Sequence, residues 1–288
     1  MILDTSKLIN IKKTSRGFSC QCPVCAEQNS DSKGIHMFVF SNGKFSCVAS
    51  PEHTKRIFEL VGIKNGASGQ NESTSASEKT EEPIKTPKYY DKSCLQRLFP
   101  KLDFYLDKGI NRDTLKAFEA GFAMSAALNK RIVFPVYDEK DNLIGFSGRW
   151  FQDEPPANIP KWKHITPVTQ RVYSLKLASE SIKATRTVFL VESIGNSLRL
   201  HQNGIKNVLV TFGTTLSSKI INYLVANSIQ KIYIALDNDE AGREGAAKME
   251  KKLSCFFDKD KIRQIYPSKK DWFEMSDSEI KAYFNNLT

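Results

Sequence analysis

Acidic residues follow two apolar segments in the second half of the chain. Glu192 comes directly after residues 188–191, and Asp237 comes directly after residues 231–236, with Asp239 two positions further on. Because the carboxyl ends of parallel strands meet at one edge of a sheet, these carboxylates are expected to lie close together. Carboxylate oxygens are ligands that Mg²⁺ prefers, and Mg²⁺ keeps positions open for water and phosphate. The pattern predicts a magnesium site formed by Glu192, Asp237 and Asp239.

A structural role competes with this interpretation. Acidic residues at the start of a helix cap its N–H groups and interact favourably with its dipole, and we prefer that role for Glu240. Asp271, beside two lysines after another apolar segment, is expected at the same sheet edge as a further magnesium carboxylate. A simple surface position fits Asp271 as well.

Cysteine and histidine residues near the start of the chain have the spacing of a metal site. Cys22 and Cys25 form a Cys-x-x-Cys pair, and Cys47 and His53 follow it. An Asn-Gly pair between the two halves predicts a hairpin that returns the second pair of ligands to the first. Three sulfurs and one imidazole suit tetrahedral Zn²⁺, and four protein ligands close the site to water. The zinc is therefore predicted to be structural.

The fourth ligand is open at this point. Cys20 and His36 compete with His53 for the position, although Cys20 has an awkward spacing and His36 fits the start of a strand. The six cysteines, in a chain without an export signal, are expected to be reduced thiols.

Composition narrows the class of protein. The chain has 288 residues, a net charge of +10 and 40% hydrophobic residues, which are enough for one or two folded cores. The positive charge favours a polyanionic partner. An apolar run of membrane-spanning length and the pattern of a signal peptide are both missing from the sequence, so we expect a cytoplasmic protein without membrane contact.

A change of composition divides the chain. Residues 64–90 are rich in Ser, Thr and charged residues and cannot form a core, so they are predicted to be a flexible linker. The linker separates a zinc-binding domain, residues 1–63, from a larger part. We expect the larger part to contain an α+β subdomain over residues 91–186 and an α/β domain over residues 187–288.

The last domain alternates short apolar strands with helices, which indicates an α/β layer with a mostly parallel sheet. Its predicted strands are residues 188–191, 207–211, 231–236 and 262–266, and its predicted helices lie near residues 195–203, 217–227 and 240–253. In the subdomain ahead of it, strands are predicted over residues 131–137 and 143–150, and helices over residues 94–106 and 112–120.

The order of these motifs resembles that of DnaG-type primases, in particular those of bacteriophages and plasmids, whose catalytic core is a Toprim fold. The zinc module is followed by Glu192 and then by Asp-x-Asp-x-x-Gly from Asp237. Further matches are Arg-Ile-Val-Phe-Pro from Arg131, Gly-Phe-Ser-Gly-Arg ending at Arg149, and Lys-Asp ending at Asp271. The resemblance covers nearly the whole chain.

The resemblance implies a zinc ribbon, a Rossmann-like Toprim domain and the activity of a DNA primase. Such an enzyme synthesises short RNA primers on single-stranded DNA from ribonucleoside triphosphates by Mg²⁺-dependent nucleotidyl transfer. It also implies that basic residues handle the anions; our candidates are Arg131, Arg149, Lys130 and Lys161. Because the chain has no P-loop motif, any replicative helicase must be a separate protein. The implied setting is a bacterial or phage-infected cell.

Asn196 departs from the family pattern, which has an aspartate at this position. The loss of one acid is expected to lower metal affinity. Two other functions therefore stay open: a catalytically weakened single-stranded DNA-binding or replication accessory protein, and a Toprim-type nuclease.

Overall fold

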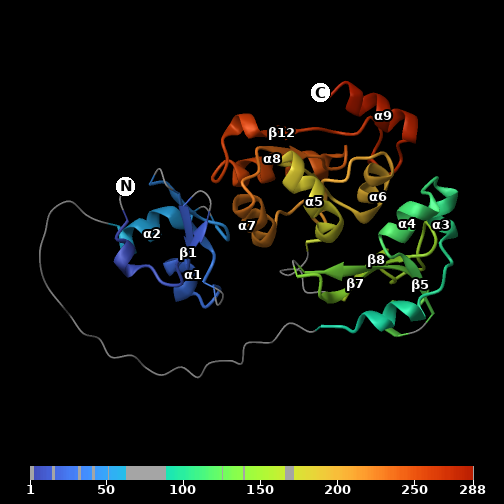
Figure 1. Cartoon of the computed structure of the whole chain (residues 1–288), viewed down its shortest axis with the longest axis horizontal. Coiled ribbons are helices and arrows are strands. Elements are labelled where there is room, and N and C mark those ends of the chain that lie inside the picture. Colours follow the sequence, from blue (N-terminus) through green and yellow to red (C-terminus); the bar gives the residue numbers. More distant parts are fainter. Residues whose placement is uncertain are drawn as a thin grey trace, which may run out of the picture. The chain divides into compact units, whose positions relative to one another are not determined.

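The chain divides into two units, Met1–Lys88 and Tyr89–Thr288, each described here by itself (Figure 1). The computed structural model describes residues 3–14, 17–31, 34–40, 43–50, 52–62, 89–124, 126–138, 140–165 and 172–287. All but the last two residues of the predicted linker, residues 64–90, lie outside these ranges. Within the described ranges, no helix is both long and apolar enough to cross a membrane.

The first unit is built on a four-stranded antiparallel sheet. Its strands, in spatial order, are β1 (Lys12–Thr14), β2 (Gly17–Cys20), β3 (Met37–Phe40) and β4 (Phe45–Cys47). A short helix, α1 (Pro23–Glu27), follows β2, and α2 (His53–Val61) follows β4. Strands β3 and β4 pair antiparallel, as the Asn-Gly pair predicts, although residues 41 and 42 lie outside the described part.

An antiparallel sheet opens the second unit. It has the order β5 (Gly121–Ala123), β6 (Arg131–Tyr137), β7 (Leu143–Trp150) and β8 (Trp162–His164). The predicted strands over residues 131–137 and 143–150 are confirmed. Two short helices, α3 (Asp103–Asp107) and α4 (Arg112–Ala117), precede this sheet.

The predicted helix over residues 94–106 is wrong. A 3-10 helix ends at Arg97, Phe99 then pairs with Phe122 in an antiparallel bridge, and α3 begins only at Asp103. Pro100 explains the break, because proline has no N–H to donate and disfavours helical backbone in the residue before it.

The second unit continues with a parallel sheet. Its order is β10 (Val208–Val210), β9 (Thr187–Val191), β11 (Lys231–Ile234) and β12 (Ile262–Gln264), and neighbouring strands all run parallel. The accompanying helices are α5 (Leu175–Thr185), α6 (Ile194–Gln202), α7 (Ser218–Ala226), α8 (Glu240–Leu253) and α9 (Asp277–Asn285). The α/β layer is as predicted, whereas α5 and α9 were not expected from the sequence.

One apolar core joins the two sheets of this unit. It includes Tyr105 of α3, Phe134 of β6, and Phe189 and Val191 of β9. The rings of Tyr105 and Phe134 meet edge to face at 5.5 Å. The antiparallel sheet is therefore packed as part of the same body as the parallel sheet, and residues of both can line one cavity.

Candidate metal centre and acidic cavity

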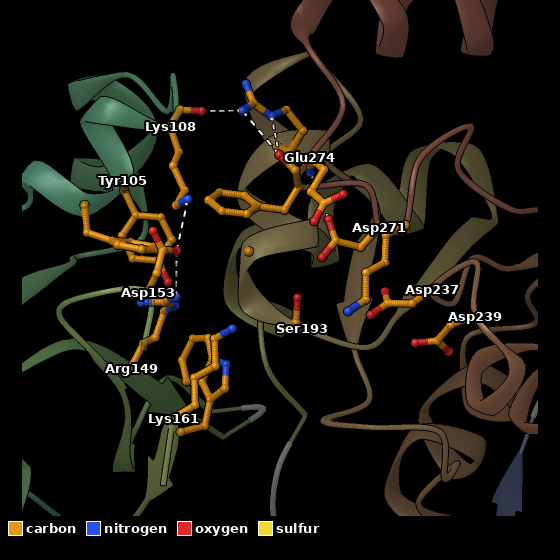
Figure 2. A pocket seen from close by; sticks show the side chains of 16 residues that line it. Tyr105, Lys108, Arg149, Asp153, Lys161, Ser193, Asp237, Asp239, Asp271 and Glu274 are labelled. Atoms are coloured by element: carbon orange, nitrogen blue, oxygen red, sulfur yellow. Dashed lines mark hydrogen bonds and ion pairs between the residues drawn. The ribbon is translucent and has the colours of Figure 1, made fainter. Parts of the chain in front are cut away.

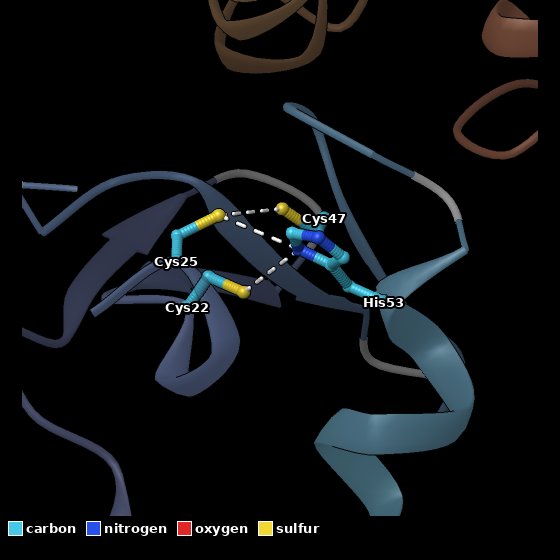
Figure 3. Close-up of side chains that lie close together, drawn as sticks. All are labelled: Cys22, Cys25, Cys47 and His53. Carbon is cyan, nitrogen blue, oxygen red and sulfur yellow. Dashed lines mark hydrogen bonds between the residues drawn. The ribbon is translucent and has the colours of Figure 1, made fainter. Parts of the chain in front are cut away.

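The first unit brings Cys22, Cys25, Cys47 and His53 together (Figure 3). Their ligand atoms all lie within 4.8 Å of one another. The Sγ atom of Cys25 is 3.5 Å from Sγ of Cys47 and 3.5 Å from Nδ1 of His53. Cys22 directly precedes α1 and Cys25 lies within it, whereas Cys47 ends β4 and His53 begins α2.

These ligands fit zinc in number and type. Burial and the neighbouring Cys47 raise the pKa of the Cys25 thiol to about 11. Three adjacent thiolates therefore require a cation to exist together, and Zn²⁺ bound to sulfur and imidazole supplies it. The structure places His53 in the cluster, whereas His36 lies 3.9 Å from the Asp31 carboxylate and Cys20 lies outside the cluster.

Carboxylates meet at the carboxyl edge of the parallel sheet in the second unit. Asp237, Asp239 and Asp271 line one cavity of about 550 Å³ (Figure 2). Glu192 stands beside them, because its Oε1 accepts a hydrogen bond of 3.1 Å from the Asp237 backbone N–H. Asp271, for which the sequence also allows a surface position, lines the same cavity.

The acidic groups differ in their hydrogen bonds. Asp239 caps α8 by accepting from the Gly242 N–H at 2.9 Å, so the capping role weighed for the acids of this segment falls to Asp239. Asp271 accepts from the Glu274 N–H at 2.8 Å. Asp237 accepts from the side chain of Asn196 at 2.7 Å.

Burial makes Glu192, Asp237 and Asp271 hard to ionise together. Burial and the charge of Glu192 raise the pKa of Asp237 to about 7. Burial also raises the pKa values of Glu192 and Asp271. Neighbouring like charges disfavour ionisation, and a bound cation reverses this. The donor set therefore suits a hard divalent cation.

Gly242 is the residue that lets α8 begin beside the carboxylates. A Cβ atom at this position would lie 2.1 Å from the Asp237 carbonyl oxygen and 3.1 Å from Oε1 of Glu192. Any side chain would therefore push the helix away from the strand ends. The Asp-x-Asp-x-x-Gly motif thus has a steric reason for its glycine.

Basic residues form the opposite side of the cavity (Figure 2). Arg149, from the end of β7, is buried and its guanidinium lies 3.5 Å from the ring centroid of Phe104. Lys108, just after α3, forms an ion pair of 3.0 Å with Asp153. Lys161 lines the same side. Positively charged side chains therefore face the carboxylates of the sheet edge across the cavity.

Two of the predicted anion-binding residues lie elsewhere. Arg131 is buried and donates to the carbonyl oxygens of Gly148, Pro160 and Lys161 at 3.1, 2.7 and 3.1 Å. It holds the segment that carries Lys161, whereas Lys130 is exposed outside the cavity lining. Direct anion binding by Arg131 and Lys130 stays a prediction.

Sequence reasoning missed Arg199, which ties the two walls together. It is buried in α6 and donates to the carbonyl oxygen of Lys108 at 2.6 Å and to the Asp277 carboxylate at 3.0 Å. Lys108, Phe104 and Asp153 were missed as well. The one available signal for Arg199 was its position within an apolar helical segment. That signal does not predict which residues far away in the sequence Arg199 contacts.

Comparisons with known proteins agree with this architecture. A family model described as Toprim-like matches residues 189–276, which contain Glu192, Asp237, Asp239 and Asp271. The chain is 25% identical to a DNA primase of Campylobacter jejuni over 288 residues, covering 83% of this chain and 47% of that protein. It is 27% identical to a DNA primase of Clostridium acetobutylicum, covering 83% of this chain and 48% of that protein. The chain thus spans about half the length of these relatives.

Solved structures show the same fold. The zinc-binding and RNA polymerase domains of the Aquifex aeolicus primase match with a TM-score of 0.56 at 19% identity, covering 98% of this chain and 81% of that chain. A DnaG primase catalytic domain bound to single-stranded DNA matches with a TM-score of 0.56 at 18% identity, covering 68% of this chain and 75% of that chain. The resemblance to DnaG-type primases is confirmed; the bacteriophage or plasmid origin stays a prediction.

Proposed function

We propose that this chain is a DNA primase that synthesises short RNA primers on a single-stranded DNA template. The observation that carries the proposal is the cavity in which the carboxylates at the sheet edge face Arg149, Lys108 and Lys161. Nucleotidyl transfer needs a cation site and anion-binding groups at the same place, because the substrate is a polyanion. The likeness to DNA primases supports this choice among the chemistries that such a cavity can host.

The acidic side fits Mg²⁺, which prefers oxygen ligands and keeps water in its coordination shell. Glu192, Asp237 and Asp239 would hold it, with Asp271 beside them. When bound, Mg²⁺ favours deprotonation of an attacking hydroxyl and neutralises phosphate charge. The elevated pKa values of Asp237 and Glu192 support this assignment, because these acids gain most from a nearby cation.

The basic side would bind the triphosphate of a ribonucleotide. Arg149 is held in place by its stacking on Phe104 and by hydrogen bonds to the carbonyl oxygens of Trp150 and Gln152 at 2.6 and 2.9 Å. Its orientation is therefore set before substrate arrives. Lys161 and Lys108 add positive charge, and Trp162 lines the cavity with an aromatic face on which a base can stack.

The zinc-binding unit would contact the template, and the helicase that accompanies a primase would be a separate protein. The net charge of +10 supports contact with single-stranded DNA. We place this activity in the cytoplasm of a bacterial or phage-infected cell, where template and ribonucleotides are available.

The test is primer synthesis on mixed-sequence single-stranded DNA with labelled ribonucleotides and Mg²⁺. We expect short RNA products from the zinc-loaded protein, their loss in Asp237→Ala, and their persistence in Lys183→Ala, which alters an exposed residue of α5. Products that survive in Asp237→Ala would contradict the site. A folded protein that binds the DNA without making RNA would favour an accessory protein, and Mg²⁺-dependent shortening of labelled DNA would favour a nuclease.

A further inference from the structure

Asn196 is a fully buried amide in the middle of the acidic cluster. Its side chain has 0% exposure and lies in the first turn of α6, directly after β9. Its Nδ2 donates to Oδ1 of Asp237 at 2.7 Å, and its Oδ1 accepts from the Phe273 backbone N–H at 3.2 Å. One side chain thus connects the end of β11 with the segment that carries Asp271.

The direction of these bonds matches an amide and does not match an ionised acid. A carboxylate at this position can accept from Phe273 but has no N–H to donate to Asp237. It would instead place a further negative charge at hydrogen-bond distance from a carboxylate whose neighbours already include Glu192 and Asp271. An amide satisfies both partners without adding charge.

From this geometry we infer that Asn196 is a positioning residue that acts through Asp237 and organises the cation site before a cation binds. This inference rests on the proposed function, because it concerns the same site. Asn196 holds one oxygen of Asp237, and the hydrogen bonds to the Asp237 side chain in the described part of the chain all end at that Oδ1 atom. The other carboxylate oxygen is thereby left to a ligand.

The amide of Asn196, in place of the aspartate of the family pattern, affects the site in two ways. Loss of an acid lowers the charge of the site, but the amide replaces repulsion with a hydrogen bond in the cation-free protein. Removing a group that orients a metal ligand typically lowers metal affinity by about ten- to a hundredfold. Asn196 is thus expected to matter for cation affinity although it coordinates nothing itself.

Mn²⁺ binding to the whole 288-residue chain, loaded with zinc, tests this role without nucleotide or template. Free Mn²⁺ is followed by electron paramagnetic resonance, and the melting temperature is measured with and without Mn²⁺. The variants are Asn196→Ala, Asn196→Asp and Asp237→Ala. Ser197→Ala is the matched control, because Ser197 is buried next to Asn196 but bonds to Ser174 instead, at 3.1 Å.

We expect Asn196→Ala to weaken Mn²⁺ binding about ten- to a hundredfold, while Ser197→Ala leaves it within about twofold. Asn196→Asp should melt about 2–4 °C lower without Mn²⁺, because it places a second negative charge against Asp237. The melting temperature of this variant should rise more on addition of Mn²⁺ than that of the parent protein. The role of Asn196 would be overturned if Asn196→Ala bound Mn²⁺ like Ser197→Ala, or if Asn196→Asp melted like the parent without Mn²⁺. If Asp237→Ala also bound Mn²⁺ like the parent, the cation site of the proposed function would be refuted instead.

Discussion

Asp237 is the acid in which burial and neighbouring charge act most strongly together. Its folded-state pKa of about 7 lies above its ordinary value of 3.8, so the folded cation-free protein binds a proton more tightly than the unfolded chain does. The stability that this proton contributes is fully present below pH 3.8 and is lost as the pH rises through 7. A cation competes for the same carboxylate, so its stabilising effect should grow over that range.

We therefore expect Asp237→Asn to raise the melting temperature of the cation-free protein at pH 8 by a few degrees and to abolish the stabilisation by Mg²⁺. The reason is that the amide removes a partly buried negative charge beside Glu192, a charge that a cation would offset. Melting curves of the zinc-loaded protein at pH 5 and pH 8, with added Mg²⁺ and in buffer free of Mg²⁺, measure both effects. A variant that melts below the parent protein at pH 8 without Mg²⁺ would contradict the prediction.

Arg149 illustrates how one guanidinium can be fixed by geometry as well as by charge. Lysine at this position keeps the charge but cannot stack on Phe104 and donate to two carbonyl oxygens at once. We expect Arg149→Lys to lower kcat/KM for ribonucleotide incorporation about tenfold or more while the fold is retained. Steady-state kinetics with circular dichroism check this, with Lys183→Ala as the control for a substitution at an exposed position outside the cavity lining. Unchanged kinetics would remove Arg149 from the anion-binding side.

At the scale of elements, the site depends on how closely α8 approaches the ends of β9 and β11. Asp239 caps the helix, and Gly242 leaves space for the helix to begin there. Asp237 and Asp239 therefore both lie at the sheet edge. On the other side, Arg199 of α6 bonds to the segment after α3 and to the start of α9. The walls of the cavity are therefore held by contacts between helices rather than by the strands alone.

Gly242→Ala tests the approach of α8. In an ordinary helix this change stabilises by up to about 1 kcal/mol, because glycine is the poorer helix former. Here the Cβ would lie 2.1 Å from the Asp237 carbonyl oxygen, so we expect a lower melting temperature and lost primer synthesis. Ala247→Gly, at an exposed position of the same helix, should cost about 1 kcal/mol and leave synthesis intact. A stabilised Gly242→Ala protein would refute the close approach.

At the scale of the whole molecule, the two units keep their folds by different means. The second unit has one extended apolar core, whereas the smaller core of the first unit surrounds the metal cluster and includes all three cysteine ligands. Below about 70 residues a core alone rarely suffices, and a structural zinc can contribute on the order of 10 kcal/mol to folding.

Zinc removal should therefore unfold the first unit and spare the second. With a zinc chelator at neutral pH, amide exchange of β3 and β4 should become fast, while that of β9 and β11 stays slow. His53→Ala should lower zinc affinity by more than His36→Ala does, since only His53 belongs to the cluster. Protection of β3 and β4 that survives chelation would show that the zinc is dispensable for the fold.

Local patterns in the sequence determined much of this protein. Alternating apolar segments predicted the strands and helices of the α/β layer, and the cysteine spacing predicted the zinc ligands, because these signals depend on neighbours along the chain. The helix expected over residues 94–106 failed where Pro100 and the bridge between Phe99 and Phe122 intervened. There, a contact with a distant strand outweighed local helical pattern.

The tertiary structure alone decided what lies across the cavity. The sequence around Arg199, Lys108 and Asn196 does not predict which residues each of them contacts. Those partners are set by how two sheets and their helices pack, and burial then shifts the pKa of Asp237. Residue type and spacing therefore predicted which acids meet at the sheet edge. The shifts in the pKa values of these acids follow instead from packing between segments far apart in the chain.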